Sequence, residues 1–483
     1  MGLDVIRVAN NDTSPRPSSG IRRRRDGCTE CKRKKVRCDL QKPICTRCLR
    51  YPRGCTYTLS IVPDKVSDQL ASGLASALLT LRQPTLDPSP LLQSDEAKFY
   101  MHVFSTETAL RLFPAAPPIF LQSLIAASVE TPHLFYALLA AACSHHGRLV
   151  GDSSPHSRTL CLRYTTLALS SLNSALQASS EDTMTVTTGT VATAMALCTN
   201  DVCNGNMHVW RTHLSGAGHL LAALLDNKKS KHNRYTAQAE EDPYIDCLVK
   251  WFTTLDVLAG MSGAQADVLY SERVPWYRPV STTSTKGTVI DNICGYSLDL
   301  VPLLVRISHL VHGGGLDLGS GVETLEVSLI ESGLYSLLAS PTCTAPESSS
   351  SPLPSGLSTA ELQNTHSAFV HSSLLHLHRR IQKLPQDDPR VRSDIVNILR
   401  SLTAISPSSP ANILILWPIF SAGCETSCPA EREFIHERMH HMQKLGLGNF
   451  TRAAQLLGDY WGSQTALPWD VYFSALGCEM VLF

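Results

Sequence analysis

Six cysteines near the N-terminus constrain this chain more than any other feature. Two, six, six, two and six residues separate the members of the series Cys28, Cys31, Cys38, Cys45, Cys48 and Cys55. Two intervening residues let a pair of thiolates reach one metal ion. Three thiolates per half leave each tetrahedral zinc ion one ligand short, so six cysteines complete two ions only if two thiolates bridge both metals. We therefore predict a centre with two Zn²⁺ ions, which stabilises a segment too short for a hydrophobic core.

The sequence shows neither a secretory signal nor a stretch long enough to span a membrane, and this bears on the redox state of the cysteines. Residues 1–21 contain no apolar stretch of the ~7–15 residues that a secretory signal needs. The longest apolar run, Leu134 to Cys143, is about half of the ~20 residues that span a bilayer. We therefore expect no membrane partner, a reducing compartment, and thiols that bind metal rather than form disulfides.

Charge is distributed unevenly along the chain. The whole sequence holds 42 basic and 42 acidic residues, but residues 1–60 hold 15 basic and 5 acidic ones, a net charge of +10. The remainder holds 27 basic and 37 acidic residues, a net charge of −10. A basic head on an acidic body predicts a polyanionic partner at the N-terminus.

Cations lie between and before the cysteines. The first half of the cysteine series holds Lys32, Arg33, Lys34, Lys35 and Arg37, the second half holds Arg47, Arg50 and Arg53, and Arg22, Arg23, Arg24 and Arg25 lie just upstream. Such cations neutralise phosphates and release counterions, which makes binding steeply dependent on salt. The upstream run is also typical of a nuclear import signal, and a solvated cationic run is an equally weighted alternative.

This segment resembles the fungal binuclear zinc-cluster family of transcription factors. The matching stretches run from Gly27 to Asp39 and from Lys42 to Cys48, and the match closes at Cys55. The resemblance implies that Cys28 and Cys45 bridge the metals. It also implies that a CGG-type triplet in double-stranded DNA is read in the major groove by Lys34 and Lys35, late in the first helix. The cations that it assigns to phosphates are Lys32, Arg33, Arg37, Arg47, Arg50 and Arg53.

The sequence divides into four predicted segments. Residues 1–20 are a polar, disordered tail, and residues 21–58 are the cysteine module. Residues 59–93 are a linker with a short amphipathic helix from Lys65 to Arg82, whose apolar stripe runs from Val66 to Leu81. That stripe is interpreted either as a dimerisation coil, which would make a homodimer, or as a face packed on the rest of the chain.

Residues 94–483 have helical periodicity throughout and predict one all-α domain. Its expected helix starts are Thr131-Pro132 and the capping box Ser358–Glu361. One buried helix face is expected to carry Trp210, Leu214, Ala217, Leu221 and Leu224. We expect residues 226–242 to be a charged loop and residues 340–358 to be a disordered loop. Four histidines beside the latter, at positions 366, 371, 376 and 378, are expected to be solvated.

Two stretches of this region resemble the fungal-specific regulatory domain found behind such clusters. They run from Asn206 to Ala217 and from Trp417 to Glu425, and Trp461 and the segment from Gly477 to Leu482 also fit. The resemblance implies a helical regulatory region and not an enzyme. The sequence also contains no GxSxG elbow, Walker loop or HExxH motif.

We therefore predict a zinc-dependent, sequence-specific DNA-binding regulator of RNA polymerase II genes in a fungal nucleus, with the transcription machinery or co-regulators as partners. Control of one pathway or biosynthetic gene cluster is a further option. The alternative is a helical metabolic enzyme or scaffold that carries a zinc-bound nucleic-acid tether.

Overall fold

The computed structural model describes residues 28–40, 45–49, 55, 89–177, 186–232, 242–262, 288–312, 321–339, 341–343, 356–478 and 480–483. They belong to two compact units, 1–86 and 87–483. The predicted tail, the upstream arginine run, Arg50, Arg53 and the helix predicted from Lys65 to Arg82 lie outside the described residues.

The prediction of a mainly helical fold is confirmed. The first unit contains α1 (Thr29–Arg33) and α2 (Thr46–Leu49). The second unit contains, in order, η1 (Pro90–Leu92), α4 (Asp95–Val103), η2 (Phe104–Thr108), α5 (Ala109–Leu112), α6 (Pro118–Glu130), α7 (Pro132–Leu149), α8 (Pro155–Gln177), α9 (Thr188–Cys203), α10 (Val209–His232), α11 (Pro243–Met261), β1 (Val289–Ile290), α13 (Leu300–His312), α14 (Gly321–Leu337), β2 (Thr342–Cys343), α15 (Thr359–His376), η4 (Leu377–Ile381), α16 (Pro389–Thr403), η5 (Pro410–Ile413), α17 (Leu416–Glu425), α18 (Pro429–Gln443), α19 (Gly448–Ser463) and α20 (Trp469–Ala475). Of these, η2 and η4 are single π-helical turns.

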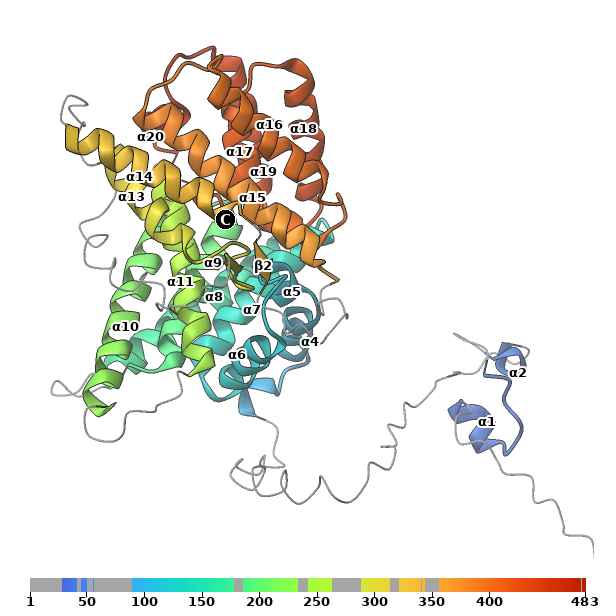
Figure 1. Ribbon diagram of the computed structural model, residues 1–483. Coiled ribbons are helices and arrows are strands. Elements are labelled where there is room, and N and C mark those ends of the chain that lie inside the picture. The colour runs from blue at the N-terminus through green and yellow to red at the C-terminus, as the bar shows by residue number, and fades with distance from the viewer. Residues whose placement is uncertain are drawn as a thin grey trace, which may run out of the picture. The chain divides into compact units, whose positions relative to one another are not determined.

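The helices of the second unit pack in two groups, one built from its N-terminal half and one from its C-terminal half (Figure 1). In the first group α7 packs against α4, α6, α8 and α9, and α9 also packs against α10. In the second group α15 packs against α16 and α17, and α18 packs against α19. The helix α13 contacts both α11 and α15, so it joins the two groups.

Burial explains why the apolar run from Leu134 to Cys143 lies at the centre of the first group. Every residue of this run except Tyr136 is buried within α7. The predicted face of α10, from Trp210 to Leu224, is buried as well. The capping box at Ser358 and Glu361 forms as predicted, because each side chain binds the other residue's backbone N–H.

Two stretches expected to be loops contain regular structure. The helix α10 continues to His232, because lysine, which recurs beyond Asp226, has a high helix propensity. The strand β2, at Thr342–Cys343, pairs in parallel with β1. Residues 344–355 of the predicted loop lie outside the described residues.

Among the described residues, no single helix is long and apolar enough to cross a membrane. The helices α6 and α7 together meet the length and composition that crossing requires, but they bend by 119° where they meet.

The expectation of solvated histidines in α15 and η4 is wrong. His366 and His378 are 0% exposed and His376 is 4% exposed, while His371 is partly buried. The histidine rings contact residues that lie far from them in the sequence. The ring of His366, for example, accepts from the backbone N–H of Ser297 and bonds the carbonyl oxygen of Leu337. Partners this far apart in sequence cannot be recognised from the local pattern.

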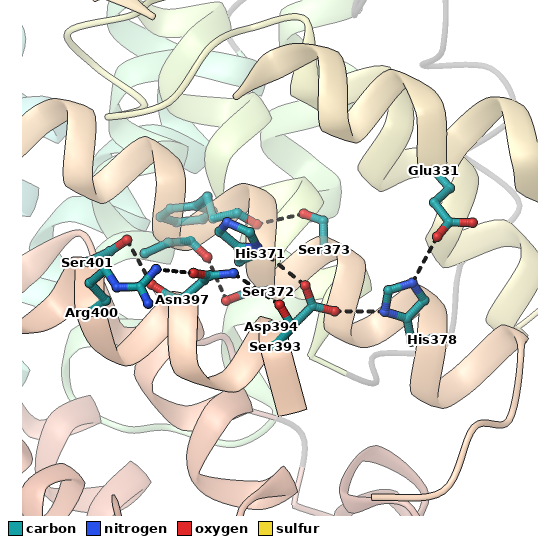
Figure 2. A network of polar contacts seen from close by, with 12 residues as sticks. Glu331, His371, Ser372, Ser373, His378, Ser393, Asp394, Asn397, Arg400 and Ser401 are labelled. Carbon is teal, nitrogen blue, oxygen red and sulfur yellow. Dashed lines mark hydrogen bonds and ion pairs between the residues drawn. The ribbon is translucent and has the colours of Figure 1, made fainter. Parts of the chain in front are cut away.

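His378 lies between two carboxylates, as Figure 2 shows. Its Nδ1 is 2.7 Å from Oδ2 of Asp394 in α16, and its Nε2 is 3.1 Å from Oε1 of Glu331 in α14. Ionised carboxylates only accept hydrogen bonds, so both ring nitrogens must donate and the ring is an imidazolium. Burial opposes this charge, but the bonds and charges of Asp394 and Glu331 outweigh it and raise the pKa of His378.

Two arginines follow His378 on the π-turn, and they pair with two other helices. Arg379 Nε lies 2.5 Å from Oε2 of Glu425 in α17. Arg380 Nη2 lies 2.7 Å from Oδ2 of Asp470 in α20. Three consecutive cations therefore connect this turn to four separate helices.

Substitution of His378 should reveal its charge in the pH dependence of stability. A raised folded-state pKa contributes stability that is complete below the unfolded value of about 6.5 and is lost as pH rises through the folded value. His378→Gln should therefore lower the free energy of unfolding by about 3 kcal/mol at pH 6, with a smaller loss at pH 9. The measurement is denaturant unfolding followed by circular dichroism.

His376→Gln is the matched control for this experiment. Burial lowers the pKa of His376 to about 4, so its ring is neutral across the tested range. Its loss should cost the same stability at pH 6 and pH 9. An equal cost at both pH values for His378→Gln would show that His378 is not an imidazolium.

Candidate metal centre

The Cys-x-x-Cys spacing gives each half of the cysteine series the same local structure. Cys28 is the N-cap of α1, and its Sγ accepts from the backbone N–H of Cys31 at 3.4 Å. The sulfur thus occupies the place that Ser or Asp oxygens usually take at a helix start. Cys45 stands in the same position before α2, and its sulfur accepts from the backbone N–H of Cys48.

The end of α1 places the two lysines that the resemblance assigns to base contact. Val36 N–H donates to the Cys31 carbonyl at 3.0 Å and Lys35 N–H donates to the Lys32 carbonyl at 3.1 Å, which is a Schellman motif. Lys35 has φ of +56° and Val36 packs against the cysteines. The helix therefore ends at Arg33, and Lys34 and Lys35 lie just beyond it instead of in its last turn.

The sulfurs gather at distances that suit zinc. The Sγ of Cys28 is 3.9 Å from that of Cys45 and 3.8 Å from that of Cys48, and the Sγ atoms of Cys31 and Cys45 are 3.7 Å apart. A tetrahedral zinc ion with Zn–S distances of about 2.3 Å sets neighbouring sulfurs about 3.8 Å apart. The residues present therefore fit the predicted metal.

The remaining two cysteines lie at the edge of this group. The Sγ of Cys38 lies within 4.8 Å of the Sγ of Cys45. The Sγ of Cys55 accepts a hydrogen bond from the backbone N–H of Cys45 at 3.5 Å. All six predicted ligands are thus brought together in the described part of the first unit.

Cys28 and Cys45 contact sulfurs of both halves of the series. Cys28 interacts with Cys31 in its own half and with Cys48 and Cys55 in the other. Cys45 interacts with Cys48 in its own half and with Cys31 and Cys38 in the other.

The thiols are crowded enough to resist ionisation unless a cation joins them. Burial, together with the neighbouring thiols, raises the pKa of Cys31 to about 12. Burial also raises the pKa of Cys28 and Cys48. The backbone N–H groups that bond Cys45 and Cys55 lower the pKa of those two thiols. Zinc binds the thiolate form, so metal binding must release protons from the buried thiols.

Two acidic residues also shape this unit, and the sequence interpretation gave neither of them a role. Asp39 Oδ2 accepts from the backbone N–H of Thr46 at 3.0 Å, so it ties the first half to the start of α2. Glu30 bonds Arg33 through Oε1 at 2.7 Å and Oε2 at 3.0 Å, and its Oε1 lies 3.3 Å from Nζ of Lys34. These bonds lower the pKa of Glu30 to about 2. The role of Glu30 could have been predicted from its position three residues before Arg33 and four before Lys34, the spacing at which side chains of a helix pair.

The described cations of this unit face solvent. Exposed positions are occupied by Lys32, Arg33, Lys34, Lys35, Arg37 and Arg47. Among the described residues, Lys32, Lys35 and Arg37 make no ion pair with a carboxylate, whereas Arg33 and Lys34 share Glu30.

Both units match known families. Residues 26–61 match the model of the fungal Zn(2)-Cys(6) binuclear cluster domain, which binds two zinc ions. Residues 98–483 match the model of the fungal specific transcription factor domain. No solved structure matches the chain.

Similar proteins match over short stretches. The lysine biosynthesis regulatory protein of Saccharomyces cerevisiae is 50% identical over 36 residues, which are 8% of this chain and 5% of that protein. The C6 finger domain transcription factor hasF of Aspergillus fumigatus is 44% identical over 55 residues, or 11% of this chain and 7% of that protein. On the family match that covers most of its length, the chain belongs to the fungal transcription factors that combine a DNA-binding Zn(2)-Cys(6) cluster with a fungal specific transcription factor domain.

Proposed function

We propose that this chain reads CGG-type triplets in double-stranded DNA and controls genes transcribed by RNA polymerase II in a fungal nucleus. The observation that carries this proposal is the set of six exposed cations around one buried group of thiols. Such a surface offers donors to phosphates and to base edges at the same time. The second unit is a regulatory region and not an enzyme, and it acts through co-regulators of the transcription machinery.

Two ions can share six thiolates only through bridging ligands, and the sulfur contacts favour Cys28 and Cys45 for that role. Cys28 interacts with Cys48 and Cys55 of the other half, and Cys45 interacts with Cys31 and Cys38 of the other half, whereas the interactions of Cys31 and Cys48 reach one thiol there. One ion would then be held by Cys28, Cys31, Cys38 and Cys45, and the other by Cys45, Cys48, Cys55 and Cys28. Bound zinc supplies a fixed cross-link, and the protein chain supplies the orientation of the cations around it.

Loss of a bridging thiol should disturb both metals. Cys28→Ala or Cys45→Ala should leave fewer than one zinc ion per chain, because each removes a ligand from both sites. Cys31→Ala and Cys48→Ala remove a ligand from one site only and should retain about one ion. The measurement is native mass spectrometry of the full chain. Equal zinc content in all four variants would contradict the bridging assignment.

The placement of Lys34 and Lys35 suits base readout. Both follow the last residue of α1, where the chain reverses, and both are exposed. A lysine can donate to O6 and N7 of guanine, a pattern that no other base presents in the major groove. Lys32, Arg33, Arg37 and Arg47, with Arg50 and Arg53 outside the described residues, are proposed to hold the phosphates.

Alanine substitutions should separate these two roles. Lys34→Ala and Lys35→Ala should each cost ~1–3 kcal/mol on a CGG duplex and little on a scrambled duplex. Lys32→Ala should weaken binding to both duplexes alike. Alanine suits position 35 because it keeps a β-carbon at positive φ, whereas glycine would also change the backbone. The measurement is a binding titration at fixed salt. An unchanged ratio of the two affinities in both variants would place base recognition elsewhere.

Glu30 should oppose DNA binding, because it neutralises Arg33 and Lys34 in the free protein. Glu30→Gln should raise the affinity for both duplexes and steepen the salt dependence by ~1 in logarithmic slope. The control is Asp95→Asn, which breaks a comparable exposed pair with Lys98 in the second unit. A Glu30→Gln variant with unchanged slope would show that the pair is already open on DNA.

Three parts of the proposal concern the protein in the cell. Arg22 to Arg25 are proposed to direct nuclear import, and the stripe from Val66 to Leu81 is proposed to form a homodimer; both lie outside the described residues. One named relative regulates lysine biosynthesis, which favours a role for this chain in controlling a biosynthetic pathway. Genome-wide mapping of occupied sites would report the triplet, the spacing of half-sites and the regulated genes together.

A further inference from the structure

Two thiols face each other between α7 and α8. The Sγ of Cys161 donates to the Sγ of Cys143 at 2.8 Å. Formation of a disulfide needs a sulfur separation of about 2.05 Å, so the atoms must approach by about 0.8 Å. Both cysteines are free thiols, and no other two cysteines of the second unit's described residues are hydrogen-bonded to each other.

The two thiols have different surroundings. Cys143 is 1% exposed, whereas Cys161 is partly exposed. The adjacent Cys161 sulfur and, after it, burial raise the pKa of Cys143 well above its usual range. The Cys143 thiol can donate to an ionised Cys161, and with Ser144 and the charge of Arg148 it lowers the pKa of Cys161 to about 7.

Arg148 is a buried cation that favours this thiolate. Its Nε donates to the carbonyl oxygen of Gly446 at 2.7 Å and its Nη1 donates to Oδ1 of Asn204. No carboxylate among the described residues forms an ion pair with Arg148, and buried charges are stabilised by opposite charge. Cys203 and Cys161 are the two thiols whose negative charge would favour this guanidinium.

We propose that Cys143 and Cys161 are a modification site at which a hydroperoxide converts two thiols into a disulfide between α7 and α8. The Cys161 thiolate attacks one peroxide oxygen, so an S–O bond forms and the O–O bond breaks. The leaving oxygen takes a proton from solvent and departs as water or an alcohol. The Cys143 sulfur then attacks the Cys161 sulfur, so the S–S bond forms and the S–O bond breaks. The hydroxide leaves with the Cys143 proton as water, and the peroxide has taken two electrons from the two thiols.

The cross-link would act on a helix that connects the two helical groups. His145 of α7 contacts the carbonyl oxygen of Leu445, and Arg148 contacts that of Gly446, between α18 and α19. A disulfide would link α8 covalently to α7. It would restrain the movement of α7 relative to the second group of helices.

The test uses the full zinc-loaded chain and hydrogen peroxide. Samples are quenched with a thiol-alkylating reagent and mapped by mass spectrometry, and a chromogenic chelator reports released zinc. We expect a peptide linked through Cys143 and Cys161 to appear before Cys478 is oxidised and before zinc is released. Its rate of formation should rise about tenfold from pH 6 to pH 8, as a thiolate with a pKa near 7 requires.

Variants separate the pair from a lone reactive cysteine. Cys143→Ser should leave Cys161 as a sulfenic acid that dimedone captures, and Cys161→Ser should leave Cys143 reduced. Cys198→Ser, at another buried thiol, should change nothing. Because the linked peptide is sought in the unmodified chain, a variant that fails to fold does not affect the main result. The proposal is overturned if Cys143 and Cys161 stay fully alkylatable while Cys478 or the zinc cluster oxidises.

Discussion

Coordination of metal by thiolates takes the place of a hydrophobic core in the described part of the first unit, and the other described residues there depend on it. Among its described residues, only Val36 packs as an apolar side chain against the cysteines. Because sulfur and metal provide the cohesion, most of the other described side chains can face solvent. The unit can therefore carry a dense set of cations on a very short chain, without the buried area that a domain of ordinary composition would need.

The sequence was most informative about the metal centre, because the spacing of cysteines along the chain indicates which of them can bind the same ion. Six cysteine positions predict the ligands, and the structure brings those six together. It was less informative about where α1 ends, because the residue at positive φ is Lys35 and not glycine, the residue that normally marks such an end. Spacing along the chain also could not show how Glu30 divides its charge between two cations, which depends on side-chain geometry.

In the second unit, local signals predicted local structure and failed for contacts between distant segments. Apolar periodicity identified the buried face of α10, and the pair Ser358 and Glu361 identified a helix start. The histidines of α15 and η4 were misjudged because their partners come from α14, α16 and other separate segments. A polar residue can be buried when its hydrogen bonds are satisfied, and that condition is met in three dimensions only.

The π-turn η4 has a consequence for how this domain tolerates change in length. Its extra backbone residue directs three consecutive cations toward Asp394, Glu425 and Asp470 on three different helices, with Glu331 on a fourth. Deletion of one residue before His378 would restore a regular α-helix and turn the three cations by about 100° around the helix axis, the angle of one helical residue. All three cations would then lose their partners together, while a conservative substitution would remove only one. We therefore expect related chains to vary in amino-acid identity at this turn far more readily than in its number of residues.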